Sequence, residues 1–178
     1  MITVGVVIDV PEPHADRIRD ARRSWGDPEA ESVPPHVTIV APVSVDPGEI
    51  PVLEEHLERA VVGCAPFRMR LRGTGTFRPV SPVVFLAVAE GIPGCEDLER
   101  RVRCGPWAVD LRFPYHPHVT VAFDLDEKAL DEAFAALSDF EAVFTVEKIR
   151  LYELGDAGWR ARARRTRSWA EPRRQWRA

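Results

Sequence analysis

The sequence has few cysteines and no long apolar run, and each shortage excludes a class of protein. Cys64, Cys95 and Cys104 are odd in number and lack zinc-type spacing, so the sequence indicates neither a disulfide framework nor a metal knuckle. No apolar run approaches the roughly 20 residues that span a bilayer. Residues 2–10 have the pattern of a first strand rather than of a signal peptide. We therefore expect a soluble, cytoplasmic protein with no membrane partner.

Charge is distributed unevenly along the chain. The formal net charge of −4 over 178 residues is modest. From residue 156 to the C-terminus, however, eight arginines stand against two acidic residues, which gives this segment +6 and leaves −10 on the rest. Such a segment can guide a polyanion, and it is equally typical of a solvated edge and tail. The length allows one well-buried domain, which we place at 1–169, followed by a basic tail at 170–178.

The sequence Pro-His-Val-Thr occurs twice, once in each half of the chain, and both copies lie in runs rich in β-branched residues that favour strands. Because alternate side chains of a strand share a face, His36 and Thr38 point the same way, as do His118 and Thr120. Each strand therefore presents an imidazole and a hydroxyl where a buried strand would normally carry apolar residues. Two such strands side by side would combine two proton-transfer groups with two neutral hydrogen-bond donors.

Hydrophobic periodicity and end signals predict an alternation of strands and helices. Strands are expected at 2–10, 35–43, 67–71, 83–88, 107–113, 117–125, 141–154 and 159–169, the last as an exposed edge strand. Helices are expected at 13–25, 46–61, 95–103 and 126–137, with a glycine- and proline-punctuated connection at 73–81.

The two halves of the chain share this order of elements, although the sequence identity between them hardly extends beyond the repeated motif. We therefore predict an α+β fold that is bilobal, with two pseudo-symmetric lobes, each of an antiparallel sheet and flanking helices. The motif strands would meet in an active cleft between the lobes.

The two motifs resemble those of the two-histidine (2H) phosphoesterase superfamily, and within it the 2′-5′ RNA ligase-like, or RNA 2′,3′-cyclic phosphodiesterase, group. That family carries His-x-Thr or His-x-Ser in an apolar strand once in each half. The resemblance also covers the order of elements and the length, up to about Trp169. It implies action on cyclic or 2′-5′ phosphodiester bonds without a metal ion or other cofactor. It also implies His36 and His118 as the catalytic pair, and Thr38 and Thr120 as phosphate ligands.

The residue types support this chemistry without the family. Opening a cyclic phosphodiester with water needs a base for the nucleophile and an acid for the departing ribose oxygen. Imidazole titrates near neutral pH, so two histidines can hold opposite protonation states. Neutral hydroxyls can stabilise the charge that grows on the phosphate oxygens. The expected partner is RNA or a nucleotide carrying a cyclic phosphate, and nothing in the sequence demands more than a monomer. The same site could run in reverse and join ends through a 2′-5′ linkage, and which histidine is the acid stays open.

The surroundings of the motifs are less defined by the sequence. Many members of the family place an arginine shortly after the second motif, where this chain has Phe123 and Asp124. Arg78 or an arginine of the tail is the substitute candidate for a phosphate partner. Phe77 and Tyr115 lie in loops next to the motif strands and are candidates for stacking on a base, although both could be ordinary core or turn aromatics.

Three alternatives remain open. His116 shares a strand face with His118, and His36 could complete a three-histidine zinc site, but no acidic residue lies at ligand spacing and the repeated threonines would be unexplained. A non-catalytic module that binds RNA ends or nucleotides would keep the same cleft. Two core histidines bonded to threonines would explain one copy of the motif but not its repetition.

Overall fold

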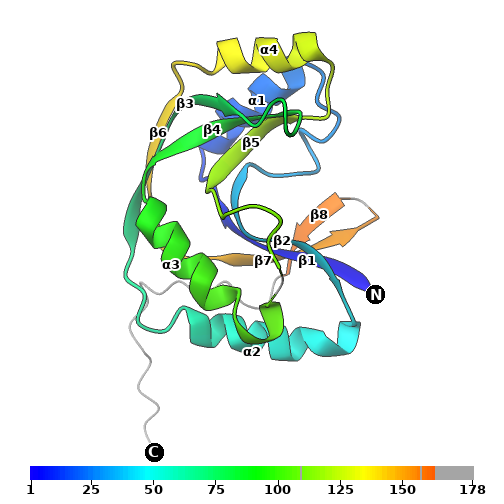
Figure 1. Ribbon diagram of the computed structural model, residues 1–178, viewed down its shortest axis with the longest axis vertical. Helices are drawn as coiled ribbons and strands as arrows, with labels where there is room; N and C mark the ends of the chain where they lie inside the picture. Colours follow the sequence, from blue (N-terminus) through cyan, green and yellow to red (C-terminus); the bar gives the residue numbers. More distant parts are fainter. Residues whose placement is uncertain (109, 157, 163–178) are drawn as a thin grey trace, which may run out of the picture.

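The computed structural model describes residues 1–108, 110–156 and 158–162, and in these ranges it is an α+β protein, as the sequence predicts (Figure 1). In chain order the elements are β1 (Ile2–Asp9), α1 (His14–Ser24), β2 (His36–Val45), the 3-10 helix η1 (Pro47–Glu49), α2 (Ile50–Ala60), β3 (Phe67–Thr76), β4 (Val83–Glu90), α3 (Ile92–Val102), the 3-10 helix η2 (Gly105–Trp107), β5 (His118–Phe123), α4 (Glu127–Ala136), β6 (Glu141–Val146), β7 (Arg150–Gly155) and β8 (Gly158–Ala161).

The strands form one eight-stranded antiparallel sheet in the order β6-β3-β4-β5-β2-β1-β7-β8. The sequence predicted a separate sheet for each half of the chain, whereas here the two halves of one sheet are joined where β2 pairs with β5. That junction has a single bridged pair, Val37 with Val119. We call β6, β3, β4 and β5 the His118 half-sheet, and β2, β1, β7 and β8 the His36 half-sheet.

Helices α1 and α3 each pack against the half-sheet that does not contain the preceding strand. Helix α1 follows β1 of the His36 half-sheet but contacts α4 and β5 of the other half. Helix α3 follows β4 of the His118 half-sheet but contacts α2 and β2. In Figure 1, α1 and α4 lie together at the top and α2 and α3 together at the bottom. Each half-sheet is therefore covered by one helix from each chain half, which ties the two halves together.

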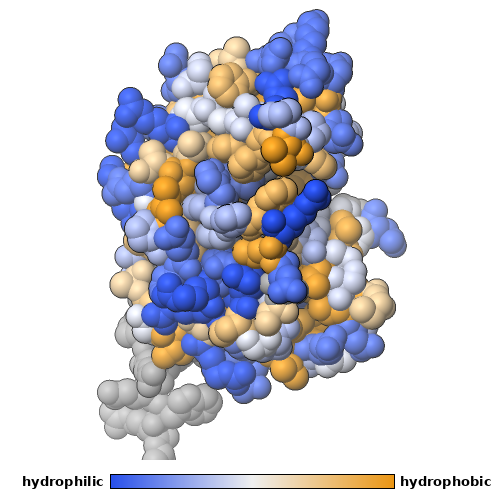
Figure 2. Space-filling model, viewed as in Figure 1, coloured by the Kyte–Doolittle hydropathy of each residue, from blue (hydrophilic) through white to orange (hydrophobic). Residues whose placement is uncertain are grey.

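Polar side chains cover much of α4. Figure 2 shows hydrophilic side chains over α4 at the top of the view, with apolar side chains scattered in the middle. Each helix contributes to one core apolar residues that are at most 3% exposed: Ile18 from α1, Leu53 from α2, Leu98 from α3 and Leu130 from α4. This division is expected for amphipathic helices that each cover one side of a sheet.

The strand predicted at 107–113 is wrong. Trp107 ends the 3-10 helix η2, is 1% exposed, and its Nε1 donates to the carbonyl of Leu53 in α2 at 3.3 Å. The described residues that follow, 108 and 110–113, are exposed and form no strand. Trp107 thus faces inward because α2 anchors it, and the alternation of the residues after it reflects no sheet.

The single strand predicted at 141–154 is also wrong, because this segment forms two strands that lie near opposite edges of the sheet. β6 pairs with β3 at one edge, while β7 pairs with β1 in the other half. Residues 147–149 connect them. The local sequence pattern does not indicate that the chain passes from one half-sheet to the other here, because both segments have the composition of strands.

Smaller boundary differences follow from backbone irregularities. β3 continues to Thr76 through the connection predicted at 73–81, with a register shift around Gly73, whose φ of +68° favours glycine. The edge strand predicted at 159–169 is present as β8, and its residues from 163 on lie outside the described residues, as does the tail predicted at 170–178.

A buried ion pair fixes the loop that leads into β2. Arg22 of α1 and Asp27 are joined at 2.7 Å between Nε and Oδ2, with side chains only 6% and 9% exposed. Arg22 Nη1 also donates to the carbonyl of Val33 at 2.6 Å. This pair therefore connects α1 to the chain just before the first His-Val-Thr motif.

We expect Asp27→Ala to lower the free energy of unfolding by about 3–5 kcal/mol, because it leaves a buried guanidinium unpaired. Urea unfolding would measure this. The matched control is Glu132→Ala, which removes the exposed pair with Lys128 on α4 and should cost no more than about 0.5 kcal/mol. Equal effects of the two substitutions would contradict a structural role for the buried pair.

Candidate active site

The two motif strands present their polar residues on one face. Val37 in β2 is fully buried, whereas its neighbours His36 and Thr38 are partly exposed. β5 repeats this alternation around Val119, which is also fully buried. The apolar residues face the core and the imidazoles and hydroxyls face away from it, as the period of a strand requires.

The antiparallel register brings these polar residues together. Because Val37 pairs with Val119, His36 lies opposite Thr120 and Thr38 lies opposite His118. Around this pair, each histidine is therefore on the same side of the bridge as the threonine of the other strand. The prediction that the two motif strands meet is confirmed by this pairing.

Both histidines are held in the same way. His36 Nδ1 lies 2.7 Å from the carbonyl oxygen of Pro34, and His118 Nδ1 lies 2.7 Å from the carbonyl oxygen of His116. A carbonyl can only accept a hydrogen bond, so Nδ1 carries the proton in each ring. Nε2 is then the nitrogen left to take or give a proton. In both motifs the accepting carbonyl belongs to the residue two positions before the histidine, so Nε2 has an equivalent position on both strands.

The electrostatic surroundings differ between the two histidines. Burial lowers the pKa of His36 and the charge of Arg22 adds to this, while the hydrogen bond to Pro34 and the charge of Asp9 act to raise it. Burial also lowers the pKa of His118; the hydrogen bond to the His116 carbonyl raises it, and the positive forms of His116 and His36 lower it further. Of the pair, only His36 thus has a carboxylate that favours its protonated form.

Asp9 reaches this position from the neighbouring strand, since it pairs directly with His36 in the β1–β2 register. Its carboxylate accepts a hydrogen bond from the Tyr152 hydroxyl at 3.0 Å, and its other oxygen lies 2.6 Å from Arg150 Nε. These contacts from β7 fix the carboxylate beside the first motif. No sequence motif marks Asp9, because its role depends on which strand lies next to β2.

Aromatic side chains pack around His118. Phe77 meets the His118 ring edge to face, with centroids 5.0 Å apart, and Phe85 lies 5.2 Å from it. Phe85 in turn covers Gly75, where an added Cβ would come within 2.5 Å of the Phe85 ring. Phe77, a candidate from the sequence, is therefore brought to the second motif, where it supports the orientation of His118.

Arg78 and Tyr115 make contacts that the sequence did not indicate. Arg78 Nη1 lies 2.7 Å from Glu127 and 2.9 Å from Asp131, both on α4, so its charge is compensated by carboxylates. The Tyr115 hydroxyl donates to the backbone carbonyl of Thr38 at 3.0 Å, and burial raises the pKa of this phenol. Tyr115 thus braces β2 from the loop before β5.

The threonine hydroxyls remain available to a ligand. Within the described ranges neither Thr38 nor Thr120 makes a side-chain hydrogen bond to the protein. Hydroxyls in this state can donate to phosphate oxygens. The structure therefore places four polar groups on one face, and two of them have no hydrogen-bond partner among the described residues.

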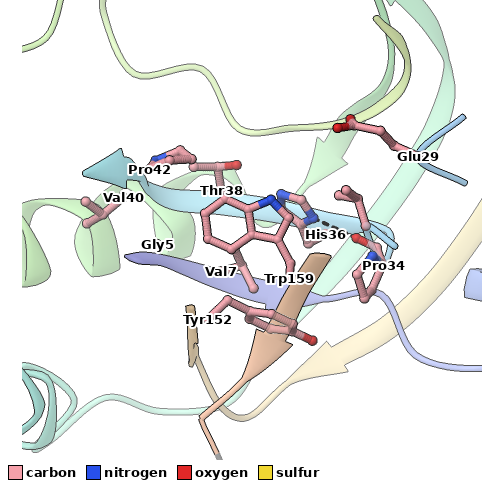
Figure 3. Close-up of a pocket in the computed structure, with 11 residues that line it drawn as sticks. Gly5, Val7, Glu29, Pro34, His36, Thr38, Val40, Pro42, Tyr152 and Trp159 are labelled. Carbon is pink, nitrogen blue, oxygen red and sulfur yellow. Dashed lines mark hydrogen bonds between the residues drawn. The ribbon is translucent and has the colours of Figure 1, made fainter. Parts of the chain in front are cut away.

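A cavity of about 160 Å³ opens beside the first motif (Figure 3). His36 and Thr38 line it from β2, Tyr152 and Trp159 line it from β7 and β8, and Val7 lies between them on β1. His118 and Thr120 are not among its lining residues. Sequence reasoning missed Tyr152 and Trp159 as site residues, because only the strand order β2-β1-β7-β8 brings them near His36.

In residues 1–108, 110–156 and 158–162 no three His, Cys, Asp or Glu side chains gather in a cluster suited to a metal ion. None of the helices in those ranges combines the length and apolarity needed to cross a bilayer.

Curated proteins of similar sequence carry phosphoesterase names. “Putative phosphoesterase BH1439” of Halalkalibacterium halodurans is 25% identical over 158 residues, which cover 87% of this chain and 91% of that protein. “Putative phosphoesterase GK0864” of Geobacillus kaustophilus is 26% identical, with 87% and 90% covered.

Solved structures share the fold. E. coli LigT, crystallised with 3′-AMP, matches with a TM-score of 0.66 and 19% identity, covering 96% of this chain and 99% of LigT. The protein TT0787 of Thermus thermophilus matches with a TM-score of 0.57 and 23% identity, covering 93% and 96%. The sequence profile of the 2′-5′ RNA ligase superfamily matches residues 10–158, which include both motifs. The resemblance to 2H phosphoesterases is thereby confirmed, and the chain belongs to the 2′-5′ RNA ligase superfamily.

Proposed function

We propose that the protein is a metal-independent phosphodiesterase that opens a 2′,3′-cyclic phosphate, at an RNA end or on a small nucleotide, to a phosphomonoester. The observation that carries this proposal is the paired arrangement of the two motifs. Two histidines, each with Nδ1 bonded to a carbonyl, stand across one strand pair from two threonines. Membership of the phosphoesterase family supports hydrolysis, and the cyclic phosphate is our extension of it.

The arrangement supplies what the reaction needs. One neutral imidazole takes a proton from water as the water oxygen forms a bond to phosphorus. The bond from phosphorus to a ribose oxygen breaks, and the other imidazole, protonated, gives that oxygen its proton. Thr38 and Thr120 donate to the nonbridging oxygens as negative charge grows on them. One proton is taken up and one is released, so the pair ends with its protons exchanged.

The surroundings of the two histidines favour one assignment of these roles. Burial lowers the pKa of both histidines, but Asp9 opposes this at His36, against Arg22, whereas the charges of His116 and His36 lower the pKa of His118 further. His36 is then the general acid for the ribose oxygen and His118 the general base for water. If a ribose 5′-hydroxyl attacks in place of water and the 3′-oxygen leaves, the same roles give a 2′-5′ linkage. Cleavage of that linkage back to the cyclic phosphate is the reverse step, in which the two roles exchange.

We expect His36→Ala and His118→Ala each to lower kcat for a 2′,3′-cyclic nucleotide by about 10²- to 10⁴-fold, the usual contribution of one positioned proton-transfer group. Hydrolysis would be measured with 2′,3′-cyclic AMP and with a short RNA ending in the cyclic phosphate, in excess EDTA. His56→Ala is the matched control, because His56 is partly buried but hydrogen-bonded to the Val102 carbonyl on α3. It should retain most of the activity.

Three outcomes would contradict the proposal. Loss of wild-type activity in EDTA would favour a metal hydrolase built on the histidines. Nucleotide binding without turnover of either compound would favour a non-catalytic binding module. An equal loss of kcat in the His56 variant would mean that the motif histidines affect activity only through the stability of the fold.

We expect Asp9→Asn to shift the alkaline limb of the pH–rate profile to lower pH. The alkaline limb reports the pKa of the general acid, and loss of the Asp9 charge lowers the pKa of His36, so the acid loses its proton earlier as the pH rises. The measurement is kcat/KM against pH for wild type and variant. Glu147→Gln, an exposed carboxylate change between β6 and β7, is the control and should leave both limbs in place. Movement of the acidic limb instead would reverse the assigned roles.

A further inference from the structure

Three tryptophans lie in the described residues, and one of them differs from the other two. Trp25 is 8% exposed and its Nε1 donates to the Val121 carbonyl at 3.2 Å. Trp107 is 1% exposed and its Nε1 donates to the Leu53 carbonyl at 3.3 Å. Trp159 is only partly buried, and within the described ranges its indole nitrogen has no protein partner. Because tryptophan N–H groups in a core are normally bonded, the first two are structural and the third is free for a ligand.

The ring of Trp159 forms a wall of the cavity beside the first motif. In Figure 3 the indole lies in front of β2, with Thr38 on one side and His36 on the other, and these three residues line the same space. Val7, Pro34 and Pro42 make most of the remaining lining apolar. An apolar cavity thus opens directly onto an imidazole and a free hydroxyl.

The position of Trp159 is fixed by two neighbouring segments. Trp159 pairs with Leu154 in the β7–β8 hairpin, and its backbone N–H donates to the Ser32 carbonyl at 3.3 Å. Gly158 has a φ of +94°, and a Cβ there would come within 2.7 Å of Ser32 Cβ, so the hairpin is packed closely against this loop. The wall is therefore formed before any ligand arrives.

The size of the cavity indicates what it holds. Its volume of about 160 Å³ is smaller than the roughly 300–1,000 Å³ of pockets that hold a whole drug-sized ligand. It suits one flat ring system attached to a larger group outside. Next to His36 and Thr38, that outer group would be the ribose and its cyclic phosphate.

We propose that this cavity is the base-binding subsite of the enzyme, in which the nucleobase of the nucleotide bearing the cyclic phosphate stacks on Trp159. The proposal rests on the function proposed above and identifies the nucleobase as the part of the substrate that this cavity recognises. Stacking on an indole tolerates every base, because every base has a π face. The subsite therefore selects nucleotides over other sugar cyclic phosphates rather than one base over another.

The test compares two substrates that differ only in the base. One is 2′,3′-cyclic AMP, and the other is methyl ribofuranoside 2,3-cyclic phosphate, which has a methoxy group in place of adenine. The variants of the full chain are Trp159→Ala and Trp159→Phe. Arg160→Ala is the control, because Arg160 is the exposed next residue of the same strand and lines no part of this cavity.

With Trp159→Ala we expect KM for 2′,3′-cyclic AMP to rise about 5- to 150-fold, the range for loss of one base stack, with kcat little changed. Turnover of the methyl riboside should be unaffected. Trp159→Phe should restore most of the affinity, since phenylalanine also stacks, and Arg160→Ala should match wild type. Equal losses on both substrates would show a structural role and overturn the proposal, as would unchanged KM for both.

A direct binding measurement separates this proposal from the proposed function. If wild type turns over neither compound, the proposed function fails, and titration calorimetry with 3′-AMP then tests the subsite alone. Weaker binding of 3′-AMP by Trp159→Ala than by wild type would support the subsite. Equal binding by the two proteins would overturn it.

Discussion

The pairing of β2 with β5 is the constraint on which the rest of the site depends. The two half-sheets meet there through one bridged pair, Val37 with Val119, and this register alone decides that each histidine stands beside the threonine of the other strand. A slip of one residue would turn the polar side chains of a motif strand toward the core. The Tyr115 hydroxyl on the Thr38 carbonyl and the exchange of α1 and α3 between the halves both hold this junction.

Charge at the site comes from few groups. Phe123 and Asp124 come shortly after the second motif, and Arg78 is paired with two carboxylates of α4. In the proposed mechanism, the groups of the described residues that meet the phosphate are two hydroxyls and a protonated His36, whose protonated form Asp9 favours. Such a site stabilises the charge that develops on the phosphate oxygens mainly through oriented neutral donors.

The sequence could predict what depends on local pattern. The period of the strands put His36 and Thr38 on one face, and the capping residue Asp126 marked the start of α4. It could not predict which strands become neighbours, because that depends on contacts between distant segments. For this reason residues 141–154 were predicted as one strand. Asp9 and Trp159 were not predicted as site residues, although both lie beside His36.

Acid–base catalysis by His36 and His118 is best tested by the pH dependence of kcat/KM for 2′,3′-cyclic AMP, measured with metal ions chelated. Two histidines in opposite protonation states predict a bell-shaped profile, whose acidic limb is lost in His118→Ala and whose alkaline limb is lost in His36→Ala, measured on the residual activity. A flat profile between about pH 5 and 8, the range in which histidine titrates, would contradict the two-histidine mechanism.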